Sequence, residues 1–182
     1  RRAGEDVLQT LRRRYGRLRL RINEVKSAVA RPWDRKVLGY SFWVAPGSTV
    51  KRRVAPAALA AMKAQMRALT GRSRGCSIAT VVADLRGYLL GWKAYFRLAD
   101  TPGVFLALDQ WLRCRLRMVY LKQWKRGTTT FRELRARGVS RLVAAQAASH
   151  THRWWFTAHH AALHIALPTR HFDRLGVPRL AS

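Results

Sequence analysis

Apolar residues recur every three or four positions through the middle of the chain, which is the spacing of one face of an α-helix. Three such stripes predict three helices: one opens at Pro56, one follows the N-cap candidate Ser77, and one spans residues 104–125. Helices joined by short loops favour an antiparallel bundle. A basic amphipathic helix is also expected over residues 4–20.

A different pattern occupies residues 27–54, where β-branched and aromatic residues gather in short runs. The runs cover residues 27–33, 37–44 and 49–54, and proline and glycine separate them. Two or three antiparallel strands are expected here, with a turn at Pro46–Gly47.

Shorter apolar repeats follow Gly127 and three threonines, and they predict helical pieces at residues 129–137, 140–148 and 158–166. The expected fold class is therefore mainly α. A small α+β segment leads into a helical bundle, and a short, basic, mostly helical C-terminal region follows. The expected segments are residues 1–54, 55–126 and 127–182.

The excess of basic residues indicates a polyanionic binding partner. The chain has 36 Lys and Arg against 9 Asp and Glu, a formal net charge of +27. A surface with so few acids repels itself unless a polyanion neutralises it. Because basic residues occur in all three segments, an extended nucleic-acid footprint fits best, ahead of an anionic membrane or no polyanion at all.

The cysteines, the lengths of the apolar runs and the first residue indicate what kind of protein the chain belongs to. Cys76 and Cys114 form no CxxC pair, so both are interpreted as reduced thiols of a cytoplasmic protein. No run reaches the ~18 apolar residues of a membrane-spanning helix. The chain starts at Arg1 rather than Met, which is expected of a fragment of a longer protein.

Two consecutive segments carry a family signature. Residues 85–96 read LRGYLLGWKAYF, and residues 108–117 read LDQWLRCRLR, with Trp124-Lys125 further on. They resemble successive helices of the maturase-specific domain of group II intron-encoded reverse transcriptases. Residues 20–26 (LRINEVK) and 36–42 (KVLGYSF) resemble the end of the polymerase palm in the same family.

The C-terminal end adds to this resemblance. Residues 166–168 and 172–178 are similar to the tail of bacterial maturases that lack an endonuclease domain. The resemblance implies that residues 1–54 are a palm remnant, residues 55–126 the thumb or X domain, and residues 127–182 a basic C-terminal region.

The resemblance also implies a function. Members of the family bind group II intron RNA and assist its folding and splicing, and their thumb contacts the RNA template–DNA primer duplex. Their polymerase holds two metal ions with a Tyr-x-Asp-Asp turn, but this sequence contains no Asp-Asp pair. The chain, expected to begin just past that turn, should be inactive alone, with no catalytic residue. No cofactor is expected, and Mg²⁺ would matter only in a full-length polymerase.

Other interpretations stay open at this point. The chain could be part of an active RNA-directed DNA polymerase whose N-terminal half precedes it. It could be a degenerate fragment of a mobile element without a present role. It could also be an unrelated structural RNA-binding protein, such as a ribosomal one.

Basic side chains on the expected helices are the candidate RNA ligands. A planar guanidinium can bind phosphate in two places, and A-form RNA is recognised through its shape, phosphates and 2′-hydroxyls. For each residue the alternative is a solvated charge on a helix face. The candidate RNA-binding residues are Arg86, Lys93, Arg97, Arg113, Arg117, Lys122, Lys125, Arg126, Arg153 and Trp154.

Aromatic and histidine residues give weaker signals. Trp92, Phe96 and Trp111 fall on apolar stripes and are expected in the core, whereas Trp154 or its neighbour Trp155 is a candidate for stacking on a base. All 6 histidines follow residue 149, and His160 and His164 have a spacing that zinc ligands use. Few acids or cysteines accompany them, so they are interpreted as RNA-proximal side chains rather than a metal site.

Overall fold

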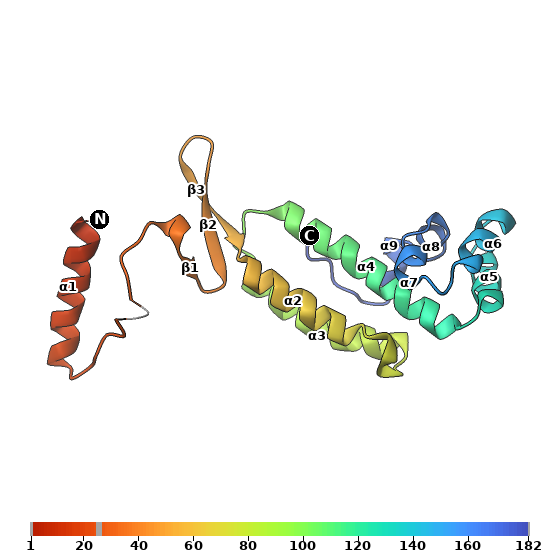
Figure 1. Cartoon of the computed structure of the whole chain (residues 1–182), viewed down its shortest axis with the longest axis horizontal. Coiled ribbons are helices and arrows are strands. Elements are labelled where there is room, and N and C mark those ends of the chain that lie inside the picture. The colour runs from red at the N-terminus through yellow and green to blue at the C-terminus, as the bar shows by residue number, and fades with distance from the viewer. Residues whose placement is uncertain (1, 25–26, 182) are drawn as a thin grey trace. The chain divides into compact units, whose positions relative to one another are not determined.

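The computed structural model describes residues 2–24 and 27–181, which form two compact units, Arg1–Ala55 and Pro56–Ser182 (Figure 1). The predicted fold class is confirmed: the chain is mainly helical, with one small antiparallel sheet. Within the described ranges, no helix has the length and apolar character needed to cross a bilayer. Residues 25–26, part of the segment similar to a palm end, lie outside the described residues.

The first unit begins with helix α1, Arg2–Arg17. It ends earlier than the predicted residue 20, because Arg19 has a φ of 56°, a left-handed conformation that a helix cannot continue through. Beyond α1 the chain turns back, and Arg12 Nη2 lies 2.6 Å from Glu24 Oε2. This ion pair fixes the return at an exposed position.

The sheet of the first unit has the order β1-β2-β3, with β1 at Lys36–Val37, β2 at Tyr40–Ala45 and β3 at Thr49–Val54. Ala45 pairs with Thr49, which places Pro46 and Gly47 in the predicted turn. The run at residues 27–33 is not a strand. It ends in the 3₁₀ helix η1, Pro32–Asp34, where proline has no N–H to give to a sheet.

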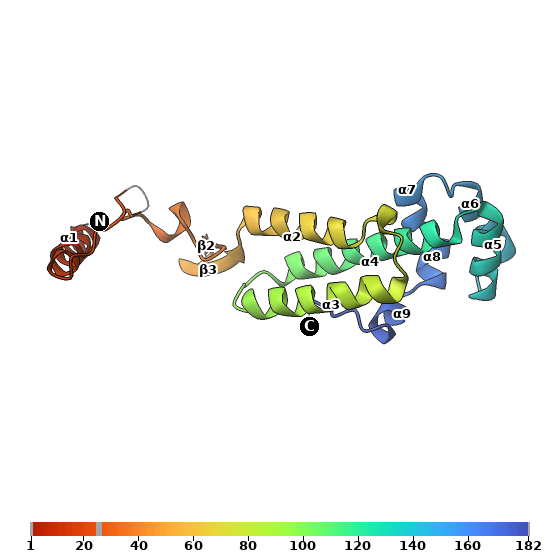
Figure 2. The same ribbon diagram turned by 90° about the horizontal axis from the view of Figure 1, so that it is seen from below.

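The second unit is built on three helices, α2 (Pro56–Leu69), α3 (Ile78–Tyr95) and α4 (Pro102–Trp124). They run antiparallel and side by side in both views (Figures 1 and 2), as the short loops predicted. Ser77 caps α3, since its side chain accepts a hydrogen bond from the Thr80 amide at 3.2 Å. The predicted stripes meet in the core, where the largest fully buried side chains include Met62, Met66, Leu85, Leu89, Leu112 and Leu116.

Five short helices follow α4: α5 (Gly127–Ala136), α6 (Arg141–Ser149), α7 (Trp154–Ala158), α8 (Ala161–Ala166) and α9 (Thr169–Arg174). The 3₁₀ helix η2, Arg72–Arg74, joins α2 to α3. The helix predicted over residues 158–166 ends at Ala166 as predicted but begins later, at Ala161. The chain breaks at His160, whose Nδ1 accepts from the Ala162 amide at 3.2 Å and so caps a new helix, α8.

The C-terminal tail, residues 175–181, returns from α9 along α3 and α4 (Figures 1 and 2). Val177 and Leu180 are buried against the bundle. Together with α7 to α9, this tail covers much of α4, which therefore becomes a central helix rather than an outer one.

Candidate nucleic-acid interface

The tail engages two of the predicted RNA-binding residues of α3. Arg86 Nη1 donates to the Gly176 carbonyl at 3.2 Å, and Lys93 Nζ donates to the Arg179 carbonyl at 2.9 Å. Arg97, one turn later, is exposed and borders a hollow of about 250 Å³ beside Leu180. Arg86 and Lys93 thus help to hold the tail, and RNA contact by these three side chains stays a prediction.

Arg113 and Arg117 do not lie on an exposed face of α4, which corrects the sequence-based picture. Each is only 3% exposed, because α8, α9 and the segment around Leu167 cover that side of the helix. Arg113 Nη2 lies 3.3 Å from Asp173 Oδ1, and its Nη1 lies 3.7 Å from Asp109 Oδ1. Periodicity within one helix cannot reveal a cover that comes from a distant part of the chain.

Arg117 is buried without a carboxylate partner among the described residues. Its Nε and Nη2 donate to the Leu167 carbonyl at 3.2 and 3.0 Å. Burial lowers the pKa of its guanidinium, and the nearby positive charge of Arg113 acts in the same direction. The fold therefore holds a cation whose charge is not balanced locally.

Lys122 and Trp154, both predicted site residues, come together at the far end of α4. Arg72 of η2 places its guanidinium carbon 5.2 Å from the Trp154 ring centroid, and Lys122 Nζ lies 5.9 Å from it. These are cation–π distances. The half-buried indole of Trp154 thus holds two cations in place, which differs from the free stacking surface expected from the sequence.

A second tryptophan on α4 has the same surroundings. Trp111, expected in the core, is half-buried, and the guanidinium carbons of Arg67 and Arg115 lie 5.5 and 5.9 Å from its ring centroid. Arg115 Nε donates to Thr70 Oγ1 at 3.0 Å, which ties α4 to the end of α2. The two tryptophans and their four cations form a continuous basic–tryptophan face, comprising Arg67, Arg72, Trp111, Arg115, Lys122 and Trp154.

Positive charge on the basic–tryptophan face is not neutralised by its neighbours. The pKa of Arg115 lies below its ordinary value, first because of burial and then because Arg67 and Arg72 are close. A basic group whose pKa is lowered by other cations sits in a positive potential. An incoming anion would relieve that repulsion.

A hollow of about 300 Å³ adjoins the basic–tryptophan face beside η2. Four basic residues line it, and none of the described residues that line it is acidic. Arg74 is the one with a carboxylate partner in this part of the structure, at 2.6 Å from Asp84 on α3. The basic residues that line the hollow are Arg72, Arg74, Lys122 and Lys125.

Three other predicted residues flank helix ends. Lys125 ends α4 with a φ of 62°, and Arg126 precedes α5. Arg153 precedes α7, next to Trp154. All three side chains are exposed. The structure thus leaves Lys122, Lys125, Arg126 and Arg153 accessible, although RNA contact by them stays a prediction.

The sequence did not single out Arg67, Arg72 or Arg115 as site residues. A signal existed for Arg115, because a tryptophan four residues earlier shares its helix face. Arg72 lies in a loop segment where periodicity gives no information. Its role follows only from the approach of α7 to α4.

The histidines have structural partners instead of a shared centre. His171 Nε2 lies 2.8 Å from the Tyr120 hydroxyl, His164 Nε2 lies 3.5 Å from Arg117 Nη1, and His160 caps α8. Within residues 2–24 and 27–181, no group of three His, Cys, Asp or Glu side chains gathers where it could hold a metal ion.

Comparison with protein families gives a match within the second unit. Residues 59–138 match the family described as group II intron, maturase-specific domain. The matched range contains both segments that carry the resemblance seen in the sequence, residues 85–96 and 108–117, and it confirms that resemblance. A comparison with curated proteins finds none that matches the chain. Five residues of the basic–tryptophan face lie inside the matched range, and Trp154 follows it.

Proposed function

Because this chain contains the maturase-specific domain of group II intron proteins, we propose that it binds group II intron RNA and assists the folding and splicing of that RNA. The protein would supply binding and preorganisation, and the intron would perform the splicing chemistry. Such a role places the protein in the cytoplasm, with the intron transcript as its partner.

The observation that carries the proposal is the basic–tryptophan face. It presents four cations around two indoles, without an acidic residue among its six members. Phosphate contacts of this kind supply most of the affinity for RNA and make binding depend on salt. The two indoles attract the cations and so favour these positions, which reduces the side-chain freedom that is lost when a phosphate binds.

The location of the face supports a backbone-reading role. Arg67 and Arg72 come from the end of α2 and from η2, Lys122 from the end of α4, and Trp154 from α7. Cations from three separate elements meet on this face, which suits a structured RNA recognised through its shape and phosphates. We propose that intron specificity comes from the arrangement of phosphates that this face accepts.

Binding to a transcribed group II intron tests the proposal. The affinity of the full chain for the intron is compared with its affinity for an unrelated RNA of equal length and charge, at about 0.15 M salt. We expect tighter binding to the intron and faster splicing at limiting Mg²⁺ when the protein is added. Equal affinity for both RNAs, with no change in splicing rate, would contradict the proposal.

A further inference from the structure

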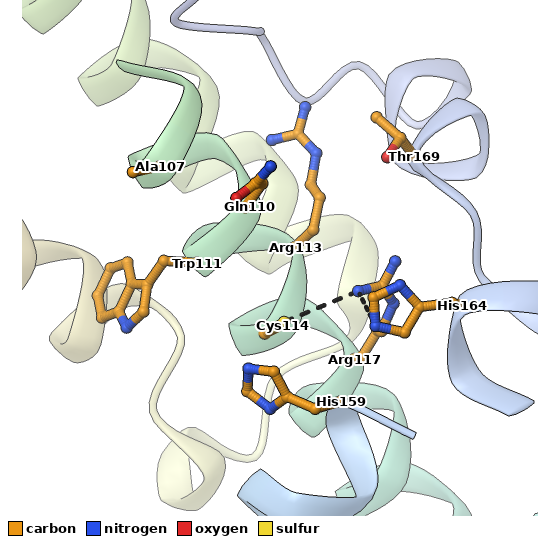
Figure 3. A pocket seen from close by; sticks show the side chains of 9 residues that line it. All are labelled: Ala107, Gln110, Trp111, Arg113, Cys114, Arg117, His159, His164 and Thr169. Atoms are coloured by element: carbon orange, nitrogen blue, oxygen red, sulfur yellow. Dashed lines mark hydrogen bonds between the residues drawn. The ribbon is translucent and has the colours of Figure 1, made fainter. Parts of the chain in front are cut away.

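A pocket of about 550 Å³ lies between α4 and the helices that cover it (Figure 3). Gln110, Trp111, Arg113 and Arg117 enter it from α4. His159 lies between α7 and α8, and His164 comes from α8. Trp111 is shared with the basic–tryptophan face, so the pocket opens next to the surface already described.

The side chains that line the pocket are basic or uncharged. None of its nine described lining residues is Asp or Glu, while Arg113 and Arg117 are both nine-tenths buried or more. Among the described residues, Arg117 contacts the Leu167 carbonyl, the Cys114 sulfur at 3.8 Å, His164 and the Phe172 ring, and none of these is a carboxylate. Burying a charge in this way costs free energy unless a counter-charge arrives.

Arg113 is better compensated than Arg117, because Asp173 Oδ1 lies 3.3 Å and Asp109 Oδ1 3.7 Å from its guanidinium. Its Nε makes no hydrogen bond in the described structure although it is fully buried, and its main carboxylate partner, Asp173, is shared with Arg179. Arg117 has no carboxylate partner among the described residues, and Arg113 beside it keeps an unsatisfied Nε, so this wall of the pocket has a surplus of positive charge. Such a surplus is the electrostatic requirement for an anion-binding site.

The size and the remaining walls indicate more than a bare anion. A pocket of this volume is in the range that holds a small organic ligand. Trp111 gives it an aromatic wall, and the Gln110 side chain at the rim can both donate and accept hydrogen bonds. A ligand that matches these features has a phosphate for the arginines, a sugar with hydroxyls for Gln110 and a flat ring for Trp111.

We infer that this pocket binds a nucleoside phosphate, with the phosphate in the field of Arg113 and Arg117 and the nucleoside against Trp111. This inference rests on the proposed function, because we take the nucleoside phosphate to be part of the intron RNA. It would be an unpaired nucleotide that is held out of the helical stack. A free mononucleotide has the same chemistry, and the experiment below separates the two sources.

Adenosine 5′-monophosphate is the first probe, titrated into the full chain while the side-chain NMR signals of His159 and His164 are followed. Gln110 is exposed, so Gln110→Glu adds a negative charge at the rim without disturbing the fold. Gln146→Glu makes the same charge change on exposed α6, away from the pocket, and is the matched control.

We expect the nucleotide to shift both histidine signals. Adenosine without phosphate should bind at least about tenfold more weakly than the nucleotide. Gln110→Glu should weaken nucleotide binding by about tenfold, the factor that 1.4 kcal/mol gives. Gln146→Glu should leave the affinity unchanged. Failure of the nucleotide to move either histidine, or equal effects of the two variants, would overturn the inference.

A second arm uses a single-stranded RNA of about ten nucleotides and a duplex of the same length. If Gln110→Glu weakens binding of the single-stranded RNA more than Gln146→Glu does, RNA is the source of the nucleotide. If the pocket binds the nucleotide but the two variants bind single-stranded RNA equally, the ligand is a free mononucleotide. If the wild-type chain binds no RNA, the proposed function fails, while the nucleotide titration still decides what the pocket accepts.

Discussion

The backbone amide of Leu180 donates a bifurcated hydrogen bond to both carboxylate oxygens of Asp109, at 2.9 and 3.1 Å, although 71 residues separate the two residues. The Ala181 amide donates to the same carboxylate at 3.1 Å. Asp109 also faces Arg113. One buried acid thus fastens the C-terminal tail to α4 and balances part of the charge of a buried arginine.

Replacing Asp109 with Asn should release the tail. The change keeps the size of the side chain but removes the charge that Arg113 and two amides share, so we expect a loss of about 3 kcal/mol in the free energy of unfolding. Urea denaturation measures this loss, and hydrogen exchange at residues 176–181 should speed up most. The control is Asp34→Asn at an exposed position of η1. Unchanged exchange in the tail would contradict the prediction.

Arg117→Glu should destabilise the second unit far more than Arg117→Met. Glutamate would lose both hydrogen bonds to the Leu167 carbonyl and place a buried carboxylate against that carbonyl oxygen, at a cost of about 3 kcal/mol or more. Methionine fills the same space and leaves only that carbonyl without its donor. Thermal unfolding compares the two variants. Equal stability of both would mean that the side chain is solvated in solution.

The apolar stripes gave α2, α3 and α4 correctly, along with the Ser77 cap, because these features depend on residues near each other in the chain. Arg113 and Arg117 were misread for the opposite reason. Their surroundings come from α8 and α9, some 50 to 60 residues away. Trp111 looked like a core residue by spacing alone, but Arg67 and Arg115 flank its ring at the edge of a pocket.

The interaction between Arg72 and Trp154 should be measurable by a double-mutant cycle. Arg72→Ala, Trp154→Ala and the double variant are compared by urea unfolding, and we expect a coupling free energy of about 0.5–1 kcal/mol. Trp154→Phe should keep part of this coupling, since a ring remains under the cation. Strict additivity of the two single changes would show that the two side chains do not interact in solution.

The second unit should lose stability as the pH falls below neutrality. Burial lowers the pKa of both His164 and His171 from 6.5. As the pH falls, the unfolded chain therefore takes up protons before the folded chain does. The contribution of these histidines to the free energy of unfolding is complete above pH 6.5, and it declines as the pH falls from there through the lowered pKa of the folded state.

His171→Gln should flatten this pH dependence, because glutamine does not titrate but can still hydrogen-bond to the Tyr120 hydroxyl. His152→Gln, at an exposed site, serves as the control. Unfolding free energies at a series of pH values from 7.5 down to 5 give the comparison. A pH profile that stays the same in His171→Gln, or that rises toward acid pH in the wild type, is incompatible with the lowered pKa of these histidines.

The salt dependence of intron RNA binding tests the basic–tryptophan face most directly. Each phosphate contact that a cation makes contributes roughly 0.7–0.9 to the slope of log affinity against log salt concentration. The exposed pair Arg72 and Lys122, both changed to Glu, is compared with the exposed pair Arg132 and Arg141 on α5 and α6, changed in the same way. We predict a slope that is shallower by about 1 to 2 for the first pair than for the second. Identical slopes and affinities for the two double variants would contradict the assignment of this face to RNA.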